Sequence, residues 1–439
     1  MRNNGRTSPS PADPANPRAK QRAFLIAAPR YAADSSLEEL GELLRTAGVA
    51  VTGTCTQIRE TPDPDRYLGK GKIGEVRRLI ESSGSNLVAC DDELSPRQER
   101  NLERELGVPV IDRTAVILDI FASHASTAEG KLQVELAQLE YNLARMRGLW
   151  THLERLGAGI GTRGPGESQI ETDRRLARDR IAQLRRRLRT TVRTRSTMRN
   201  RRERSGLPSI ALAGYTNAGK SSLLNAVTGS DAGVGDRLFH TLDPKTRAFS
   251  QEGRRMLLTD TVGFIAKLPH QLVEAFHATL EETRRADLIC HVLDASRPEE
   301  DQAAAIESVE SVLAEIGVDQ TPRLLVLNKI DLLRPDERME LRIARPEGVP
   351  VSAATGEGVA ALRGAIRDAV IDGMESLRLL FPHSEGAALA ELYTVAGDLE
   401  REETVDGVIV TAAVDEAHAR RFDRYRMEHG ANGSSRAPA

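Results

Sequence analysis

The stretch at residues 209–227 constrains the fold more than any other part of the chain. Residues 209–213 (SIALA) have the composition of a buried strand, residues 214–221 (GYTNAGKS) follow at once, and residues 222–227 (SLLNAV) suit an apolar helix. Together they place GxxxxGK[ST] in the strand, loop and helix setting that this motif requires. The glycines let backbone N–H groups turn toward phosphate oxygens, Lys220 supplies a positive charge, and Ser221 offers its hydroxyl to Mg²⁺. The stretch predicts a P-loop domain with a doubly wound α/β sheet, as in ATPases and GTPases.

Three later motifs narrow the prediction from P-loop NTPases in general to GTPases. The strand candidate at residues 256–260 ends in a DxxG (DTVG), where Asp260 can hold a Mg²⁺-bound water and the Gly263 amide can sense a γ-phosphate. The strand candidate at residues 324–328 leads into NKxD, where the Asp331 carboxylate can accept hydrogen bonds from guanine N1–H and the exocyclic amine. Adenine presents no such donor pair, and an unmet buried carboxylate penalises the wrong base. Residues 349–354 (VPVSAA) supply a loop suited to guanine O6.

A switch threonine is expected between the first two motifs, to complete the Mg²⁺ site and report the γ-phosphate. Residues 239–244 (FHTLDP) offer Thr241, although spacing alone leaves Thr228 and Thr246 as competitors. Phe264 follows Gly263, at the place where Ras-like GTPases have the glutamine that orients the attacking water. Phenylalanine cannot do this, so we predict slow unaided hydrolysis and stimulation by a partner. Packing of Phe264 in the core is the alternative reading, and both can hold.

The predicted GTP site combines these segments. We assign catalytic roles to Lys220, Thr241 and Gly263, and Mg²⁺ coordination to Ser221 and Thr241, with Asp260 acting through a water. The GTP-binding residues that we expect are Gly214, Tyr215, Thr216, Asn217, Ala218, Gly219, Lys220, Ser221, Ser222, Phe239, His240, Thr241, Leu242, Asp243, Asp260, Thr261, Val262, Gly263, Asn328, Lys329, Asp331, Ser352, Ala353 and Ala354.

A length of 439 residues is enough for about three domains, so we predict a multidomain α/β protein. Residues 1–21 are rich in Pro, Ser and Asn, lack the apolar core of a secretory signal, and predict a disordered tail in a cytoplasmic protein. No apolar run is long enough to cross a bilayer. The cysteines Cys55, Cys90 and Cys290 form no CxxC pair, and we interpret them as small buried hydrophobic residues.

An N-terminal α/β domain is predicted at residues 22–125. Strand candidates at 23–28, 49–57, 86–90 and 108–111 alternate with helix candidates at 36–47, 72–82 and from 95 onward, with Ser36 as the cap of the first helix. The GKGK at residues 69–72 lacks the GxxxxGK[ST] frame, so a turn is favoured there over a phosphate site.

An antiparallel helical hairpin is predicted at residues 126–205. Apolar residues recur in steps of four and three at Leu132, Leu136, Leu139, Leu143, Met146, Trp150 and Leu153, and a facing stripe is formed by Ala177, Ile181, Leu184, Leu188 and Val192. Residues 157–169 would connect the helices as a glycine-rich tip loop. A second helix at residues 171–202 would be roughly 45 Å long.

The hairpin also carries a dense basic block. Residues 174–204 contain fourteen arginines against Asp179 and Glu203, a net +12 within a chain of net charge −3, so the remainder carries −15. This block is a candidate contact for a polyanion, whereas the simpler alternative is a solvated helix face. Because the nucleotide has its own P-loop, we assign the stretch GTRGPGESQIETDRR (residues 161–175), which runs from the tip loop into the second helix, and the basic block to RNA. The predicted RNA contacts are Arg163, Arg174, Arg175, Arg185, Arg186, Arg187 and Arg189.

The GTPase domain is predicted at residues 206–372, and a small C-terminal α+β domain at 373–430, with a helix at 386–396 and a strand at 405–414. Residues 431–439 suit a disordered tail. Nothing in the sequence demands a dimer, so we expect a monomer.

The combination of this hairpin loop, DTVGF, NKID and the P-loop resembles the HflX family of ribosome-associated GTPases. The resemblance covers about residues 22–425 and implies a factor that binds the large ribosomal subunit and its RNA and, with GTP, splits stalled or idle ribosomes. It also implies hydrolysis stimulated by ribosomes, a hairpin reaching toward the peptidyl-transferase region, and a second nucleotide site in the N-terminal domain, where we find no phosphate motif. Departures from the usual family residues are Ala158, Ser168, His240 and Lys245.

Two further points stay open at this stage. Resemblance to GTPases with GxxNxGKS loops implies that Asn217 coordinates K⁺ beside the phosphates, whereas an Asn turn that stabilises the loop is an equal alternative. The rival functions are a GTPase that checks assembly of the large subunit, and an RNA-binding switch for which hydrolysis is incidental.

Overall fold

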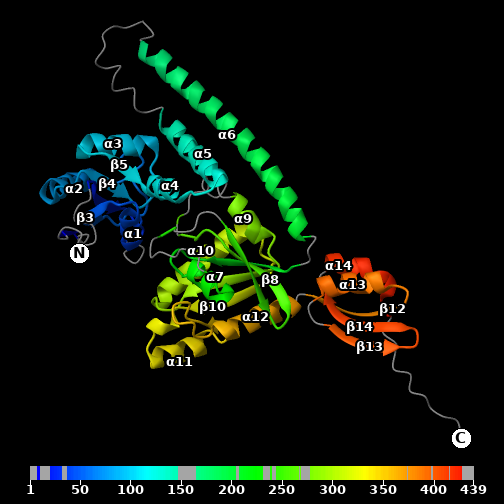
Figure 1. The fold of residues 1–439 in the computed structure, drawn as a ribbon. Coiled ribbons are helices and arrows are strands. Elements are labelled where there is room, and N and C mark those ends of the chain that lie inside the picture. The colour runs from blue at the N-terminus through cyan, green and yellow to red at the C-terminus, as the bar shows by residue number, and fades with distance from the viewer. Residues whose placement is uncertain are drawn as a thin grey trace. The chain divides into compact units, whose positions relative to one another are not determined.

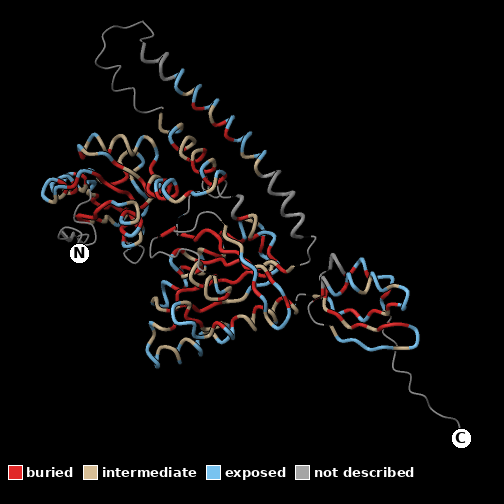
Figure 2. The backbone as a smooth tube through the Cα atoms, in the orientation of Figure 1, coloured by how far each residue is buried: buried red, intermediate tan, exposed pale blue. Residues whose placement is uncertain are grey.

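The computed structural model describes residues 7–9, 20–31, 37–146, 165–203, 207–230, 238–239, 244–265, 267, 277–372, 374–396, 399–414 and 416–427. The chain divides into two compact units (Figure 1). The first comprises Met1–Val192, Gly235–Asp243 and Val262–Thr279, and the second comprises Arg193–Val234, Pro244–Thr261 and Leu280–Ala439. In Figure 2 the buried residues concentrate on the strands and on the inward faces of the helices. Both units therefore have cores of their own.

The N-terminal part of the first unit is the predicted α/β domain, built on a sheet in the order β1-β3-β2-β4-β5. Strands β2 to β5 pair in parallel, and β1 joins β3 antiparallel. The strands are β1 (Thr7–Pro9), β2 (Arg22–Ala27), β3 (Ala50–Thr56), β4 (Leu87–Cys90) and β5 (Val110–Asp112). The helices are α1 (Glu38–Thr46), α2 (Lys70–Ser83), α3 (Pro96–Leu106) and α4 (Arg113–His124). The predicted alternation of strands and helices is confirmed.

Three local predictions in this domain need correction. Helix α1 has Leu37 at its N-cap without a side-chain hydrogen bond, and Ser36 lies outside the described residues. The GKGK segment opens helix α2 with Gly69 as its N-cap, rather than forming a separate turn. The N-terminal segment, predicted to be disordered, contains β1. In contrast, α3 has the expected start, because Ser95 and Gln98 form a capping box ahead of the proline.

The hairpin consists of α5 (Ala128–Arg145) and α6 (Pro165–Glu203), which lie side by side in Figure 1. Leu136, Ile181 and Leu184 form their buried seam, flanked by Leu132, Leu139, Leu143 and Leu188. The pairing of the two predicted stripes is thus confirmed, while Trp150 and Leu153 lie outside the described residues. Helix α6 begins at Pro165, so residues 165–169 are helical and do not belong to the tip loop. Proline suits a first helical position, and the 39 residues span roughly 58 Å.

The second unit contains the predicted P-loop domain. Its sheet has the order β11-β10-β9-β6-β8-β7, with β7 antiparallel to β8 and the other pairs parallel. The strands are β6 (Ser209–Gly214), β7 (Lys245–Gln251), β8 (Arg254–Asp260), β9 (Leu288–Asp294), β10 (Arg323–Asn328) and β11 (Val349–Pro350). The helical elements are α7 (Lys220–Thr228), α9 (His277–Arg284), α10 (Glu299–Glu315), η2 (Ile330–Leu332), α11 (Pro335–Ala344) and α12 (Val359–Asp372). Because the chain crosses from β8 to β9 past β6, the loop after β6 lies at the topological switch point.

The C-terminal part is α+β, as predicted, with an antiparallel sheet in the order β12-β14-β13. Its elements are β12 (Glu375–Phe381), α13 (Gly386–Val395), β13 (Leu399–Thr404), β14 (Gly407–Val414), α14 (Glu416–Phe422) and η3 (Asp423–Tyr425). Strand β14 begins at Gly407 rather than at Val405, because residues 405 and 406 form the hairpin turn.

All three cysteines are free and buried, as expected. None of the helices in the described parts of the chain combines the length and apolar character needed to span a membrane.

Candidate functional site

The loop between β6 and α7 is closed by a glycine in a backbone conformation that other residues rarely adopt. Gly219 is the N-cap of α7 and has φ +88°, in the left-handed region. A Cβ atom added there would lie 2.3 Å from the Asn328 side-chain nitrogen. The strand, loop and helix predicted from the motif are therefore confirmed, and the NKxD asparagine packs directly over the loop.

Lys220 lies buried at the centre of this loop. Its Nζ donates hydrogen bonds to the backbone oxygens of Gly214 and Tyr215, each at 2.9 Å. Burial lowers the pKa of Lys220 to about 8, against a weaker opposing effect of Asp260. A phosphate oxygen at this position would supply the negative charge that a buried ammonium needs. The site is therefore electrostatically suited to an anion.

Ser221 and Asp260 meet at the edge of the sheet between β6 and β8. The Ser221 hydroxyl donates to Asp260 Oδ2 at 2.6 Å, and Thr261 Oγ1 donates to the Leu212 carbonyl at 2.7 Å. The second bond ties the end of β8 to β6 and so holds Asp260 in place. A hydroxyl beside a carboxylate is a hard oxygen pair of the kind that Mg²⁺ prefers. The two residues fit the predicted metal site.

Asn328 connects three of the predicted motifs. Its Nδ2 donates to the Ala218 carbonyl of the P-loop at 2.8 Å, and its Oδ1 accepts from the Ala353 backbone N–H at 3.1 Å. The Ser352 side chain is buried and accepts from the Thr355 N–H at 3.1 Å. The structure thus brings the P-loop, NKxD and the VPVSAA loop together, although they are far apart in the sequence.

Asp331 has a carboxylate oxygen that fits its predicted contact with guanine. Its Oδ1 is buried and has no hydrogen-bond partner within the described residues, and the same holds for Thr216 Oγ1 in the P-loop. An unpaired buried carboxylate oxygen is costly unless a ligand donates to it. The neighbouring Lys329 donates to Asp294 Oδ2 at 2.8 Å. Asp294, which ends β9, is a positioning residue that the motif analysis missed, although an aspartate directly after a buried strand was a usable signal.

The switch segment is described only in part. His240, Thr241, Leu242 and Asp243 lie outside the described residues, so the Thr241 assignment stays a prediction. Of its competitors, Thr228 donates to the Leu224 carbonyl and Thr246 Oγ1 lies 3.0 Å from Thr259 Oγ1. Both hydroxyls therefore have structural partners of their own.

Two phenylalanines of the candidate site are buried. Phe264 is fully buried, which confirms the core-packing reading without testing its effect on hydrolysis. Phe239 is also buried and contacts Phe121 of α4 edge-on, with ring centroids 4.6 Å apart. Asn217 has φ +61°, which suits an asparagine in a tight loop and leaves its K⁺ role untested.

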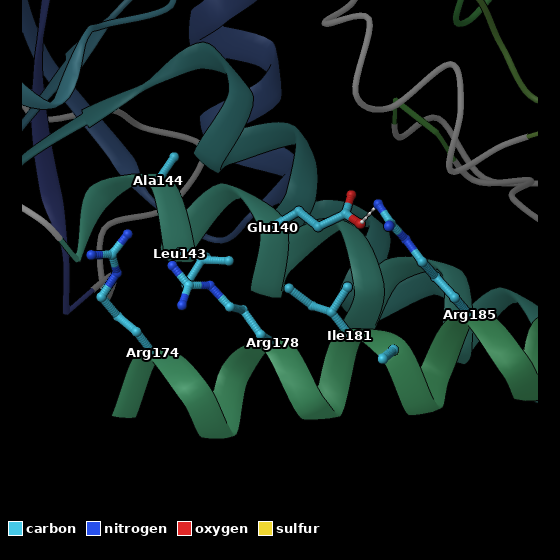
Figure 3. Close-up of a pocket in the computed structure, with 8 residues that line it drawn as sticks. Glu140, Leu143, Ala144, Arg174, Arg178, Ile181 and Arg185 are labelled. Carbon is cyan, nitrogen blue, oxygen red and sulfur yellow. Dashed lines mark hydrogen bonds and ion pairs between the residues drawn. The ribbon is translucent and has the colours of Figure 1, made fainter. Parts of the chain in front are cut away.

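Helix α6 displays most of the arginines predicted to contact RNA. Arg175, Arg185, Arg186, Arg187 and Arg189 are exposed, Arg174 is half-buried, and Arg163 lies outside the described residues. Figure 3 shows Arg174, Arg178 and Arg185 projecting around a groove whose floor includes Leu143 and Ile181. Arg185 also donates to Glu140 at 2.8 Å across the groove. Arg178 was missed, although its position three residues before Ile181 of the predicted stripe was a usable signal that it lies beside α5.

Comparison with known proteins agrees with this geometry. Family models match residues 34–122 as "GTP-binding GTPase N-terminal", residues 124–202 as "GTP-binding GTPase Middle Region" and residues 209–329 as "50S ribosome-binding GTPase". The curated relative "GTPase HflX" of Caldanaerobacter subterraneus subsp. tengcongensis is 45% identical over 399 residues, covering 90% of this chain and 92% of the relative. "GTPase HflX" of Lacrimispora saccharolytica is 46% identical over 386 residues (87% and 90%), and that of Escherichia coli is 44% identical over 383 residues (85% and 88%).

Proposed function

This chain belongs to the HflX family of GTPases, which hydrolyse GTP to GDP and phosphate, and from this premise we propose that it is a ribosome-splitting factor. In this role it binds the large ribosomal subunit and its RNA in the cytoplasm, acts as a monomer, and separates stalled or idle ribosomes into subunits. GTP binding favours the splitting conformation, and hydrolysis releases the factor.

The observation that carries the proposal is the exposed row of arginines on α6, in a chain whose P-loop, NKxD and VPVSAA segments meet at one site. Exposed arginines along one long helix suit a phosphate backbone, since each contact releases counterions from the nucleic acid. The groove beside Arg174 and Arg178 adds an aliphatic floor, and the guanidinium planes at its rim are groups on which an unpaired base can stack. The match of residues 209–329 to 50S ribosome-binding GTPases supports the large subunit as the partner.

The nucleotide acts in this proposal with Mg²⁺ bound by Ser221 and Thr241, and by Asp260 through a water. The 2.6 Å contact between Ser221 and Asp260 supports this assignment. When bound, the ion neutralises charge on the β- and γ-phosphates. Coordination of K⁺ by Asn217 is tested by exchanging K⁺ for Na⁺, which would slow hydrolysis only if the ion has this role.

Phe264 is the reason that we expect a low intrinsic rate of GTP hydrolysis. A buried phenylalanine cannot orient the attacking water, so the ribosome must organise it. Stimulation by a partner is worth roughly 10³- to 10⁵-fold in other GTPases. We expect slow turnover of the protein alone and a large increase on addition of ribosomes.

Light scattering of intact ribosomes tests the proposed function. Addition of the protein with a non-hydrolysable GTP analogue should lower the scattering as subunits separate, whereas addition with GDP should not. Binding without loss of intact ribosomes would reject splitting. It would instead favour the runner-up, a large-subunit assembly GTPase, or, if hydrolysis contributes nothing, an RNA-binding switch, which Phe264 keeps among the alternatives.

A pair of variants that lose the same number of charges tests whether the arginines of α6 bind the ribosome. Changing Arg185, Arg186, Arg187 and Arg189 to Gln should weaken ribosome binding and flatten its salt dependence, with a slope change of roughly 0.9 per lost phosphate contact for a duplex-like polyanion. The control removes four exposed arginines of α2 and α3 in the same way, at Arg77, Arg78, Arg97 and Arg104. Equal effects of both variants would mean that α6 is only a solvated helix face. Arg163→Gln in the tip loop should impair splitting while GTP affinity stays unchanged.

A further inference from the structure

The groove between α5 and α6 has the size and the lining of a site for a small ligand. Its volume is about 600 Å³, within the range of roughly 300–1,000 Å³ that small-molecule sites occupy. Leu143 and Ala144 of α5 and Ile181 of α6 form its aliphatic part, and arginine side chains stand around them (Figure 3). An aliphatic floor with a cationic rim suits a ligand that has both a flat face and an anionic group.

The arginines that α6 turns toward α5 fall into two groups. Those of the first group are neutralised by α5: Arg180 donates to Glu135 at 2.8 Å from Nε and at 2.6 Å from Nη2, and Arg185 donates to Glu140 at 2.8 Å. After Glu140, α5 continues as YNLAR and has no further carboxylate. Arginines of α6 that lie beside this last turn therefore have no acidic partner on α5.

Arg174 and Arg178 form the second group and have spare hydrogen-bonding capacity. The Nε atom of Arg174 is buried and has no hydrogen-bond partner among the residues that the structure describes. Arg178 has a long ion pair with Glu171, at 3.9 Å, in which both side chains are mostly exposed. A buried N–H without an acceptor is costly, and a ligand oxygen would remove that cost. The two guanidinium groups therefore suit a phosphate, which offers several acceptor oxygens.

The spacing along α6 places these groups on one face of the helix. Positions 174, 178, 181 and 185 follow one another in steps of four and three. Arg174 and Arg178 are one turn apart, roughly 6 Å along the axis. Ile181 comes next, and the bond from Arg185 to Glu140 closes that end of the groove. The groove thus has a cationic half and an aliphatic half, as a nucleotide has a phosphate and a base.

A groove of this kind selects unpaired nucleotides. In an RNA duplex each base is stacked between its neighbours, whereas a nucleotide in a loop or bulge exposes its faces and can stack on a guanidinium plane. The exposed Arg186 and Arg187 do not line the groove. They suit the phosphate backbone, which paired and unpaired RNA share.

We propose that this groove captures a single unpaired nucleotide of RNA, with its phosphate on Arg174 and Arg178 and its base on the aliphatic floor. This assignment rests on the proposed function, in which α6 binds RNA, and adds a selectivity that exposed arginines alone do not provide. A free nucleoside monophosphate has the same chemistry. RNA is favoured because α6 continues past the groove with the exposed Arg186, Arg187 and Arg189, which give further phosphates a contact.

Two RNA duplexes that differ only by one bulged adenosine test the capture with the full-length protein. The wild type should bind the bulged duplex about tenfold more tightly, because a stacked base adds to the phosphate contacts. Ala144→Leu combined with Ala182→Leu fills the groove without changing the charge. This variant should lose the preference and keep its affinity for the paired duplex. Fluorescence anisotropy titrations measure both affinities.

A matched pair of charge variants separates the groove from the rest of the helix. Arg174→Gln with Arg178→Gln should reduce the preference to within about twofold, because the captured phosphate loses its donors. Arg186→Gln with Arg187→Gln removes the same charge outside the groove. It should weaken binding of both duplexes by one factor and retain the tenfold preference. An unchanged affinity for GTP in each variant shows that the fold is intact.

Competition with AMP distinguishes the two sources of the nucleotide. A tenfold contribution corresponds to very weak binding of a nucleotide on its own, so roughly 0.1 mM AMP should leave the preference intact. Loss of the preference at that concentration would assign the groove to a free nucleotide and reject RNA. The proposal is also overturned if the wild type binds both duplexes equally or if the filled groove keeps the preference. Failure of ribosome splitting with an intact preference would reject the proposed function alone.

Discussion

The two parallel sheets of this protein use the same edge for opposite charges. In the GTPase domain, β6 lies between β8 and β9, and in the N-terminal domain β2 lies between β3 and β4. In each sheet the chain passes from a strand on one side of this central strand to a strand on its other side. This change of direction creates a topological switch point. After β6 comes a glycine loop with a buried lysine, whereas after β4 come two aspartates. One edge suits phosphate, and the other holds an ammonium group.

The difference in charge between the two edges has opposite effects on the pKa values of the lysines that lie there. Burial lowers the pKa of Lys220 to about 8, because its nearest partners are neutral carbonyls. Burial also lowers the pKa of Lys267, but Asp91 and Asp92 more than offset it, so that its pKa is raised. The topology selects where a ligand binds, and the side chains at the edge select its charge. The predictions below test this comparison, from the largest effect to the smallest.

The largest effect is expected for Gly219→Ala. The new Cβ would meet the Asn328 amide at 2.3 Å in a left-handed backbone, so the loop must shift and lose its link to NKxD. We expect GTP affinity to fall roughly 100-fold, as measured by calorimetric titration. The matched control is Gly71→Ala in α2, where nothing lies within 4 Å of the added atom. Equal affinities of the two variants would show that Asn328 does not close over the nucleotide loop.

Asp331→Asn should reduce the preference for GTP over other purine triphosphates about 10- to 100-fold, because an amide no longer accepts both guanine donors. Competition binding with unlabelled nucleotides measures this preference as a ratio of affinities. Asp336→Asn, five residues further along and exposed, is the control for charge. Undiminished discrimination in the Asp331 variant would remove the guanine assignment.

Lys220 predicts proton uptake on GTP binding. With a folded-state pKa of about 8 the free protein is mainly neutral at Lys220 at pH 9, and phosphates should restore the charged form. Binding at pH 9 should therefore take up about 0.9 proton, and affinity should fall about fivefold between pH 8 and pH 9. Calorimetry in two buffers of different ionisation enthalpy checks this uptake. Identical heats in both buffers would contradict it, and a titration at pH 6.5 serves as the baseline for Lys220.

The most local effect, on the exchange of a single amide, is expected at the acidic edge itself. Tyr67→Phe removes the hydroxyl that accepts from the Ala28 N–H and donates to Asp92. The lost bonds are worth about 1–2 kcal/mol, so the Ala28 amide should exchange with solvent about 5- to 30-fold faster. Hydrogen exchange followed by NMR tests this locally. Unchanged protection of Ala28 would show that Tyr67 does not order this edge, while an amide of β9 serves as the internal control.

Local patterns predicted much of the fold and of the nucleotide site. The P-loop, DxxG and NKxD are each contiguous because a strand end must present several groups to one ligand at once. The hairpin seam followed from the spacing of leucines, since a helix pair buries one stripe from each partner. The errors were also local. The proposed Ser36 cap and the turn at residues 69–72 failed because helix ends depend on the packing around them.

Contacts between distant segments were beyond such patterns. Lys329 and Asp294 are 35 positions apart, and Lys267 and Asp91 are 176 apart. No spacing rule connects residues that meet only because two sheets or two segments fold together. The groove beside α6 was also beyond such patterns, because the apolar stripe marks the side that faces α5 but not the space that the packed side chains leave open.

The sequence by itself determined that this protein is a guanine-nucleotide enzyme with a basic helical arm, because base and phosphate recognition require particular residues in contiguous motifs. Only the tertiary structure determined which groups from distant parts of the sequence contact one another. It joined Asn328 to the P-loop, left a buried oxygen of Asp331 for a ligand, and placed Lys267 between two aspartates. The physical reason is that electrostatic and packing energies depend on distance and burial in space, which chain order does not specify.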